Sequence, residues 1–437
     1  MVKLNSKMQW AVSAFFAVLI LFGTFNRIFA IVGFLGVCLL MFVCDRESIL
    51  QQLFFIMPMA NIFKMAPGSQ SFFTIVLLLY VAMYFVLPRK ATLLIVLFSF
   101  YIIIGQLASG GSFMLFRTVK LICNILFLSS VLNHKVQIDH KRIFFSYIIG
   151  NVVASCFGLL KDSSFFNIKA YVGEQGVEGI EFVDLTRFTG LHADPNYYTI
   201  GMIICLCLLV VMYHRNEVKP FFAMLLTVPI VYFLIITYSK SAILMLALPM
   251  LYLIYSLFKK KKIFSVLIIL ILAAFAVVLA LSGQIEPVNV VLSRFEAASS
   301  TDEVDINSLT TGRFDLWITY SKYMLNHYFA LFIGEGINAG LIGSHGSHNT
   351  YIQVFYYLGI VGGTLLILIF MAILSQSIMK KNKKTLLNYC VVFCMCVMYS
   401  FLGELFYFDP PFHIMLAFLT LNLSLELETK TKVIRDV

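Results

Sequence analysis

Residues 334–363 read GEGINAGLIGSHGSHNTYIQVFYYLGIVGG, and this stretch passes from a glycine-rich loop into an apolar helix. At the crossover stand His345, His348, Asn349 and Gln353. The loop is compatible with water, whereas the residues that follow are apolar enough to enter a membrane. Titratable side chains at the end of a membrane helix are costly to place and usually serve a function. We therefore expect a reacting or binding site at this crossover.

The composition of the whole chain agrees with a membrane location. Of its 437 residues, 60% are hydrophobic and only 12% are charged, which excludes an ordinary soluble protein. Apolar runs near bilayer length recur from end to end, so we expect a single all-α, polytopic membrane domain over residues 1–437 with about 12–14 transmembrane helices. The run 48–64 contains Pro58 and Asn61 and is expected to be re-entrant rather than spanning. The expected helices cover about 8–22, 28–44, 48–64, 71–87, 91–108, 113–132, 143–160, 196–213, 219–236, 241–257, 263–281, 351–379, 386–403 and 409–427.

Basic residues are unevenly distributed between the two sides of this predicted bundle. With the N-terminus inside, most of the 32 Lys and Arg residues fall in cytoplasmic segments, as the positive-inside rule requires. Both termini are then cytoplasmic, and the first span is expected to be retained rather than cleaved. The two longest loops, at about 161–195 and 282–350, become extracytoplasmic, and we expect the site on that side. The same distribution accounts for the net charge of +10 without nucleic acid.

Metal and disulfide chemistry receive little support from the sequence. The nine cysteines all lie in or beside apolar runs, so neither a disulfide framework nor a cysteine metal site is indicated. His345 and His348 are three residues apart and could bind a metal, but the loop lacks an obvious set of further ligands. The acidic run at 302–305 is typical of a solvated loop. No cofactor is therefore expected.

The first long loop ends in RFTGLHADPNYYTIG, which prepares the start of the next helix. Asp194 is expected to cap that helix, and Pro195 suits its first turn. Arg187 and His192 are then held just above the membrane, and Asn196 is a candidate substrate contact. Arg187 offers a planar cation for a diphosphate, and the alternative is a contact with lipid headgroups.

The second long loop contains SLTTGRFDLWITYSKYMLNHY at 308–328. Thr310 or Thr311 can cap a helix here, and Arg313 stands at its start, where free backbone N–H groups also attract anions. The alternative for Arg313 is a solvated residue that flanks the helix. Apolar residues recur at helical spacing, which predicts an amphipathic helix on the membrane or on the bundle: Phe314, Trp317, Ile318, Leu325 and Tyr328.

Three further basic residues are candidates for binding phosphate. Lys240 lies in the very short outer turn of TYSKSA, where it binds phosphate or extends its chain toward the membrane surface. Arg117 and Lys120 are three residues apart on one helical face, about one turn inside the outer boundary. Charges at that depth should face the bundle or a wet cavity. Both are candidate secondary phosphate contacts, and the alternative for them is again extension toward the surface.

His348 is the candidate general base because an imidazole can accept a proton from a sugar hydroxyl near neutral pH. The amide of Asn349 beside it could hydrogen-bond a sugar or cap the following helix. Around the last outer turn, Glu404, Asp409 and His413 form a reserve of acid or base candidates. The full set of candidate substrate contacts is Asn349, His345, His192, Asn196, Gln353 and Glu404.

An ordered set of motifs in the second half of the chain resembles the O-antigen polymerase/ligase superfamily of bacterial surface-polysaccharide assembly. The first half matches it only in hydropathy, and each motif by itself is weak. The resemblance rests on Arg187-Phe-Thr-Gly190 with Asp194-Pro-Asn196, Tyr238-Ser-Lys-Ser241, Gly312-Arg313 with Trp317, Gly334-Glu-Gly336, His348-Asn349 with Gln353, and Gly359 with Gly362.

This resemblance implies a metal-independent glycosyltransferase of the GT-C type in the bacterial plasma membrane. Such enzymes act on undecaprenyl-diphosphate-linked glycans after export, with an outer-loop histidine as base and outer arginines on the diphosphate. His348 takes the first role, and Arg187 and Arg313 take the second. The family often has arginine where this chain has Lys240, and a lysine keeps the charge but loses the bidentate fork. A flippase and a chain-length regulator are the partners that the resemblance implies.

We expect the protein to polymerise lipid-linked repeat units into a surface polysaccharide, either O-antigen, capsule or exopolysaccharide. A ligase of the same superfamily is the first alternative, since both transfers need a base and diphosphate contacts. A lipid-glycan flippase or other transporter is an alternative of another class. It predicts charged residues around a midplane cavity rather than at the outer surface.

Overall fold

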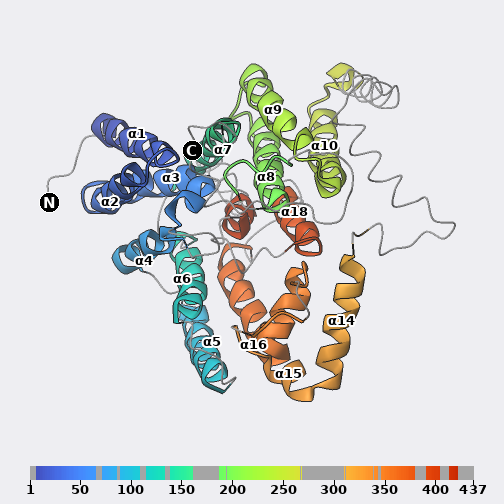
Figure 1. The fold of residues 1–437 in the computed structure, drawn as a ribbon. Helices are drawn as coiled ribbons and strands as arrows, with labels where there is room; N and C mark the ends of the chain where they lie inside the picture. Colours follow the sequence, from blue (N-terminus) through green and yellow to red (C-terminus); the bar gives the residue numbers. More distant parts are fainter. Residues whose placement is uncertain are drawn as a thin grey trace, which may run out of the picture. The chain divides into compact units, whose positions relative to one another are not determined.

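The computed structural model describes residues 6–64, 71–85, 89–108, 115–132, 138–160, 187–192, 194–265, 267, 310, 312–337, 339–342, 346–378, 390–403 and 413–421. Within these ranges the regular structure is helical, apart from one isolated β-bridge (Figure 1). The chain divides into two compact units. The first consists of Met1–Leu79 and Ile138–Glu296, and the second of Tyr80–Gln137 and Ala297–Val437. The predicted all-α fold is confirmed.

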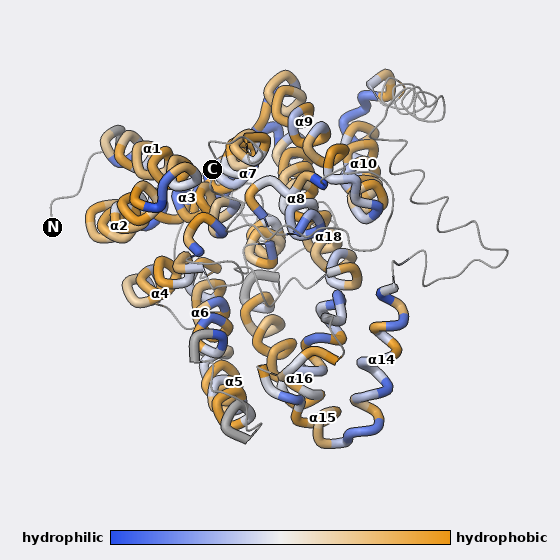
Figure 2. The backbone as a smooth tube through the Cα atoms, in the orientation of Figure 1, coloured by the Kyte–Doolittle hydropathy of each residue, from blue (hydrophilic) through white to orange (hydrophobic). Residues whose placement is uncertain are grey.

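The first unit is built around α8, which contacts α7, α9 and α10 and has most of its side chains buried. Away from α8, α1 packs against α2 and α3 packs against α7. α9 carries apolar side chains on its outside, as a helix in lipid does, and Figure 2 shows the apolar character of these helices in orange. The helices are α1 (Ser6–Phe22), α2 (Arg27–Val43), α3 (Arg46–Ile56), η1 (Met57–Phe63), α7 (His140–Gly158), α8 (Pro195–His214), α9 (Pro220–Ile235) and α10 (Lys240–Lys259). The boundary between the units falls within α4 (Phe73–Tyr84).

Local sequence explains how α8 begins and how α3 ends. As predicted, Asp194 caps α8, because its carboxylate accepts a hydrogen bond of 2.6 Å from the backbone N–H of Asn196 and Pro195 occupies the first turn. The segment 48–64 is not one α-helix. α3 ends at Ile56, and the chain continues as the 3₁₀ helix η1 with Pro58 in its first turn. A proline lacks the N–H that a continuous α-helix would need there.

The second unit is organised around the long helix α16. α5, α14 and α15 all pack against it, and in Figure 1 α14 and α16 lie side by side with α15 between their ends. The helices of this unit are α5 (Arg89–Ala108), α6 (Leu115–Val131), α14 (Arg313–Asn326), α15 (Tyr328–Ile333), α16 (Thr350–Ile378) and α18 (Val391–Ser400), and residues 413–421 are also helical.

α16 differs from the single continuous helix that the sequence predicts for residues 351–379. At Gly359 the backbone turns to φ 61° and ψ −176°, which breaks the helix. In a continuous helix, the carbonyls of Tyr356 and Tyr357 would accept from N–H groups four residues later. Instead, they accept from the N–H groups of Glu335 and Gly336, at 2.9 and 3.0 Å. The motif Gly334-Glu-Gly336 therefore supplies the hydrogen bonds that the break removes.

Tyr101 of α5 also contacts the backbone at the break in α16. Its hydroxyl lies 2.7 Å from the carbonyl oxygen of Leu358 and also against the carbonyl of Ile333. In an unbroken helix the carbonyl of Leu358 would accept from the N–H of Gly362, and at the break the hydroxyl of Tyr101 lies within hydrogen-bond distance of that carbonyl instead. Nothing local marks Tyr101 for this role in the sequence.

We expect Gly359→Ala to destabilise the second unit strongly. A Cβ at this position would lie 2.4 Å from the carbonyl oxygen of Phe332, and the backbone angles belong to a region used almost only by glycine. The strain alone costs about 1–3 kcal/mol. The check is the thermal unfolding temperature of purified protein. Gly105→Ala in α5, where a Cβ meets nothing within 4 Å, is the matched control and should leave that temperature unchanged or slightly higher. Equal temperatures for the two variants would contradict the role given to Gly359.

Three helices in the described ranges are long and apolar enough to cross a membrane: Pro195–His214, Lys240–Lys259 and Thr350–Ser375. Shorter apolar helices of 10–17 residues accompany them at Met8–Phe22, Arg27–Val43, Phe73–Tyr84, Ala91–Gly105, Pro220–Ile235 and Val391–Ser400. The expected spans at 263–281 and 409–427 lie largely outside the described residues. The protein is an all-α membrane protein, as its composition predicts.

Candidate active site

The start of α14 holds Arg313 in a defined position. Gly312 precedes the helix with φ 76°, a left-handed conformation that glycine adopts without strain, and so turns the chain into α14. The N-cap residue is Gly312 rather than the predicted threonine, but the hydroxyl of Thr310, two residues earlier, accepts from the N–H of Phe314 at 3.2 Å. Arg313 is half-buried, and its Nη1 donates to the carbonyl of Leu402 at 2.6 Å. This is one of the five N–H groups of the guanidinium, so the side chain is anchored but keeps donors for an anion.

Trp317, one turn further along α14, fastens the helix to the loop before α16. Its indole N–H donates to the carbonyl of Ser347 at 3.0 Å. Tyr320 reinforces this docking, because its hydroxyl accepts from the N–H of Ile342 at 3.2 Å and its ring lies 5.0 Å edge-on from that of Tyr356. The predicted amphipathic helix is present. Its apolar residues Phe314, Ile318 and Leu325 are exposed rather than packed on the unit, as in a helix that lies on a membrane.

His348 follows Ser347 and has an unusual backbone conformation. Its φ is 48°, a left-handed value that is uncommon for residues with a Cβ, although asparagine, aspartate and histidine adopt it more readily than others. Residues held in this region cluster at functional sites. The two residues beside it are fixed. Ser347 donates from its hydroxyl to the carbonyl of Asn349 at 3.0 Å, and both neighbours are at most 3% exposed. His348 itself is half-buried and stands between these two buried neighbours.

Asn349 caps α16, which is one of the two roles that the sequence left open. Its side-chain oxygen accepts from the N–H groups of Tyr351 and Ile352 at 3.0 and 3.1 Å. Its amide nitrogen donates to the carbonyl of Phe401 at 3.4 Å. The structure therefore shows the capping role, while a contact of Asn349 with a sugar stays a prediction.

The turn after α18 joins these two elements. Its consecutive carbonyls accept from Asn349, Arg313 and Thr350, the last through a hydroxyl 2.6 Å from the carbonyl of Gly403. Arg313 at the start of α14 and the His348–Asn349 pair at the start of α16 are therefore bound to adjacent peptides. In this way, Arg313 and His348, which are 35 positions apart in sequence, belong to one packed group within the second unit.

The capping role of Asn349 leads to a direct prediction. Asn349→Ala should lower the unfolding temperature, because loss of an N-cap costs about 1 kcal/mol, whereas Asn349→Ser should retain it since serine caps equally well. Thermal unfolding followed by tryptophan fluorescence measures both. Unchanged stability in the alanine variant, together with a raised KM in both variants, would favour the sugar-binding role.

The other predicted residues of the second unit differ in how deeply they are buried, and three lie outside the described residues. Gln353 lies one turn after Asn349 in α16 and is 4% exposed. Lys120 of α6 is 8% exposed, while Arg117 is half-buried. Burial of Lys120 does not fit a side chain extended toward a membrane surface, because that requires an exposed ammonium group. His345, Glu404 and Asp409 lie outside the described residues, and His413 is buried.

Glu335 is a polar residue of this unit that sequence reasoning did not select. The hydroxyl of Tyr323 in α14 donates to its carboxylate at 2.9 Å, and the two stacked rings of Tyr323 and His327 lie 4.2 Å apart. Burial and the neighbouring Glu335 raise the pKa of Tyr323 above its ordinary value, so the phenol stays protonated. The flanking glycines of Gly334-Glu-Gly336 were the signal in the sequence that could have identified Glu335.

In the first unit, a separate polar group forms around the turn between α9 and α10. Arg187 donates from Nε to the carbonyl of Thr237 at 3.2 Å. Ser239 caps α10 and donates to the side-chain oxygen of Asn196 at 3.2 Å, which places Lys240 as the first residue of α10. The structure therefore brings three of the predicted residues, Arg187, Asn196 and Lys240, to one turn. A guanidinium and an ammonium beside a helix N-terminus make a favourable environment for a phosphate.

Two further residues lie nearby in sequence: His192 precedes α8, and Tyr238 lies in the turn before α10. His192 is 7% exposed, with its ring 6.0 Å from that of Tyr198, so it is a core residue rather than a surface group. Tyr238 has φ 49°, the same left-handed region as His348. Among the described residues, no cluster of three or more His, Cys, Asp or Glu side chains could hold a metal.

Comparison with known proteins agrees with the resemblance drawn from the sequence. Residues 222–367 match a family model described as O-antigen ligase. The matched segment includes Lys240, Arg313 and His348, and it ends within α16. No curated protein matches the chain. The match supports a membrane protein with a function of the O-antigen ligase or polymerase type.

Proposed function

We propose that this chain, in which residues 222–367 match the O-antigen ligase model, transfers a glycan from undecaprenyl diphosphate to a hydroxyl group at the outer face of a bacterial plasma membrane. The supporting observation is the docking of α14 on the loop before α16. Through Trp317 and Arg313, a guanidinium and the loop that carries His348 become parts of one packed group. A base and a preorganised cation are the two groups that such a transfer needs.

The proposed reaction is a single displacement at the anomeric carbon of the donor glycan. His348 takes the proton from the acceptor hydroxyl as the new carbon–oxygen bond forms. The bond between the anomeric carbon and the diphosphate oxygen breaks, and the electron pair leaves with undecaprenyl diphosphate. Arg313 stabilises the negative charge that gathers on this leaving group. A single displacement inverts the configuration of the anomeric carbon.

Arg187 and Lys240 are proposed as a second group that binds phosphate, and Asn196 as the residue that helps to position it. Their support is the turn after α9, where Arg187 is hydrogen-bonded to Thr237 and Ser239 links α10 to Asn196. Lys120 and Arg117 remain candidates for secondary contacts with the diphosphate. Their spacing on α6 and the burial of Lys120 support this role.

We propose that the acceptor is a second lipid-linked repeat unit, so that the product is a polymer. The second candidate is a ligase that uses lipid A-core or a protein as acceptor, because the matching family is described as O-antigen ligase. Purified protein in vesicles, supplied only with the lipid-linked repeat unit, separates the two. A ladder of longer products supports a polymerase, while products that form only after a second acceptor is added identify a ligase.

The same vesicles test the transporter alternative. Movement of the lipid-linked glycan across the bilayer without bond formation would overturn the proposal of a transferase. A flippase and a chain-length regulator are the proposed partners of a polymerase.

A further inference from the structure

A cavity of about 270 Å³ lies in the first unit among α1, α3 and α7, far in sequence from every residue of the proposed reaction. Its volume is roughly twice that of the ~150 Å³ apolar cavity known to hold one benzene molecule. Most of its wall is hydrocarbon. The residues that line it include Gln9, Ala14, Ala17, Gln51, Gln52 and Phe55. A space of this size and character suits a segment of hydrocarbon chain.

The side-chain amide of Gln52 lies buried in the wall of the cavity. Gln52 is 6% exposed, and its Nε2 has no hydrogen-bond partner among the described residues. Its neighbour Gln51, which also lines the cavity, is satisfied because it donates to Glu47 at 3.0 Å. A buried N–H without an acceptor is costly, so an occupant that offers an acceptor to Gln52 would be favoured over a pure hydrocarbon.

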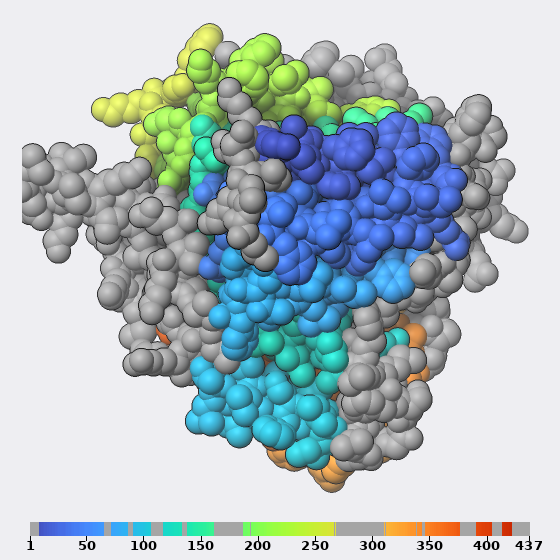
Figure 3. Space-filling model, turned by 90° about the vertical axis from the view of Figure 1, so that its left-hand side faces the viewer, coloured from blue at the N-terminus to red at the C-terminus, as the bar shows by residue number. Residues whose placement is uncertain are grey.

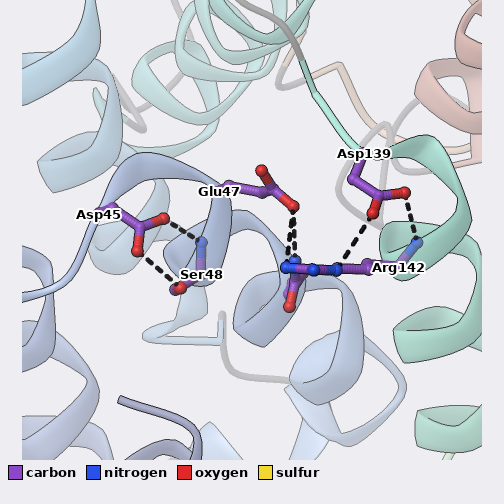
Figure 4. A network of polar contacts seen from close by, with 6 residues as sticks. Asp45, Glu47, Ser48, Asp139 and Arg142 are labelled. Atoms are coloured by element: carbon purple, nitrogen blue, oxygen red, sulfur yellow. Dashed lines mark hydrogen bonds and ion pairs between the residues drawn. The ribbon is translucent and has the colours of Figure 1, made fainter. Parts of the chain in front are cut away.

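The charges beside the cavity decide what kind of acceptor fits. Ser48 also lines the cavity, and it donates to Asp45 from its N–H at 2.9 Å and from its hydroxyl at 3.0 Å (Figure 4). The guanidinium of Arg142 lies between Glu47 at 3.6 Å and Asp139 at 3.1 Å (Figure 4). Two lining residues, Ser48 and Gln51, are thus bonded to carboxylates, which repel a phosphate. A neutral acceptor such as an ester carbonyl is favoured.

The surroundings supply such a molecule. α1 and α2 present large exposed apolar side chains, among them Phe15, Val18, Leu35 and Leu39, and Figure 3 shows the outer face of these N-terminal helices in blue. In a membrane protein this face lies against lipid. We infer that the cavity binds an acyl chain of an ester-linked glycerophospholipid, with the ester carbonyl accepting a hydrogen bond from Nε2 of Gln52.

The test uses a phosphatidylcholine that carries a photoreactive diazirine in one acyl chain. The whole protein is reconstituted in phosphatidylcholine vesicles with this probe, illuminated and digested, and the labelled peptides are identified by mass spectrometry. Wild-type protein should be labelled on peptides of α1 and α3. Ala14→Phe fills the cavity and should lower this labelling several-fold. Ala11→Phe is the matched control, because Ala11 is an equally exposed residue of α1 that does not line the cavity.

A second arm tests the hydrogen bond. An ether-linked probe with the same chain lacks the carbonyl, so the ester probe should label wild-type protein about three- to tenfold more at limiting concentration. Gln52→Leu should remove the preference for the ester probe. Gel filtration of this variant should show the same elution volume as the wild type, which confirms that the variant folds. Equal labelling by the two probes in wild-type protein, or equal labelling of the Ala14→Phe and Ala11→Phe variants, would overturn the inference. Preferential labelling by a diazirine-bearing polyprenyl phosphate, unchanged in Gln52→Leu, would also overturn it and indicate a polyprenyl site.

Discussion

Replacement of His348 should lower the rate of glycosyl transfer by about 10²- to 10⁴-fold, the usual contribution of a positioned general base. His348 stands between Ser347 and Asn349, which are fixed by hydrogen bonds and burial. Without it, the acceptor hydroxyl must lose its proton to water as the new bond forms. The measurement is the initial rate of product formation by purified protein in vesicles with a lipid-linked glycan donor and its acceptor.

The choice of substitution matters, because His348 has φ 48°. Alanine is strained in this conformation, whereas asparagine tolerates it, so His348→Asn keeps the loop while it removes the base. We expect His348→Asn and His348→Ala to be equally inactive, with the asparagine variant closer to wild type in unfolding temperature. A His348→Asn variant that transfers glycan within a few-fold of the wild-type rate would exclude His348 as the base.

Arg313→Gln should reduce the turnover rate on the order of 10²-fold, because it removes a cation that stabilises charge on the departing diphosphate. Glutamine can still donate to the carbonyl of Leu402, so the anchor of α14 is largely preserved. Arg313→Lys should show an intermediate rate, since lysine keeps the charge but not the planar fork of donors. The rates are measured at saturating donor, and unfolding temperatures are recorded beside them.

Lys322→Gln is the matched control for this series. It removes a cation from an exposed position on the same helix, nine residues after Arg313. We expect its rate and its stability to equal those of the wild type. If Arg313→Gln instead lost stability in proportion to its activity, the residue would be a structural anchor, and its assignment to the diphosphate would be wrong.

Most of the helices could be located from the sequence alone. The expected span 196–213 corresponds to α8 (Pro195–His214), and the expected span 241–257 to α10 (Lys240–Lys259). Apolar runs and local caps are encoded within a few residues, and Asp194 and Ser239 start these helices through contacts two or three residues away. Such signals do not depend on the rest of the fold.

The candidate site was predictable only in part. Arg313, His348 and Trp317 could be selected because charges and polar groups at helix ends are uncommon in so apolar a chain. That Trp317 binds the carbonyl of Ser347 and Arg313 that of Leu402 could not be predicted, since both acceptors are backbone groups with no signature in the sequence. The same is true of Asn349, whose amide is equally able to cap a helix or to bind a sugar.

The sequence by itself determined that this protein is an all-α membrane protein with polar crossover residues near His348, because hydropathy and helix capping are local properties. Only the tertiary structure decided that α16 breaks at Gly359 and which groups make the break tolerable. Residues 356–363 read as an uninterrupted apolar helix, and the hydrogen bonds that replace the lost ones come from Glu335, Gly336 and Tyr101. A helix stays broken in lipid only where distant segments satisfy its backbone, and such long-range partners exist only once the chain has folded.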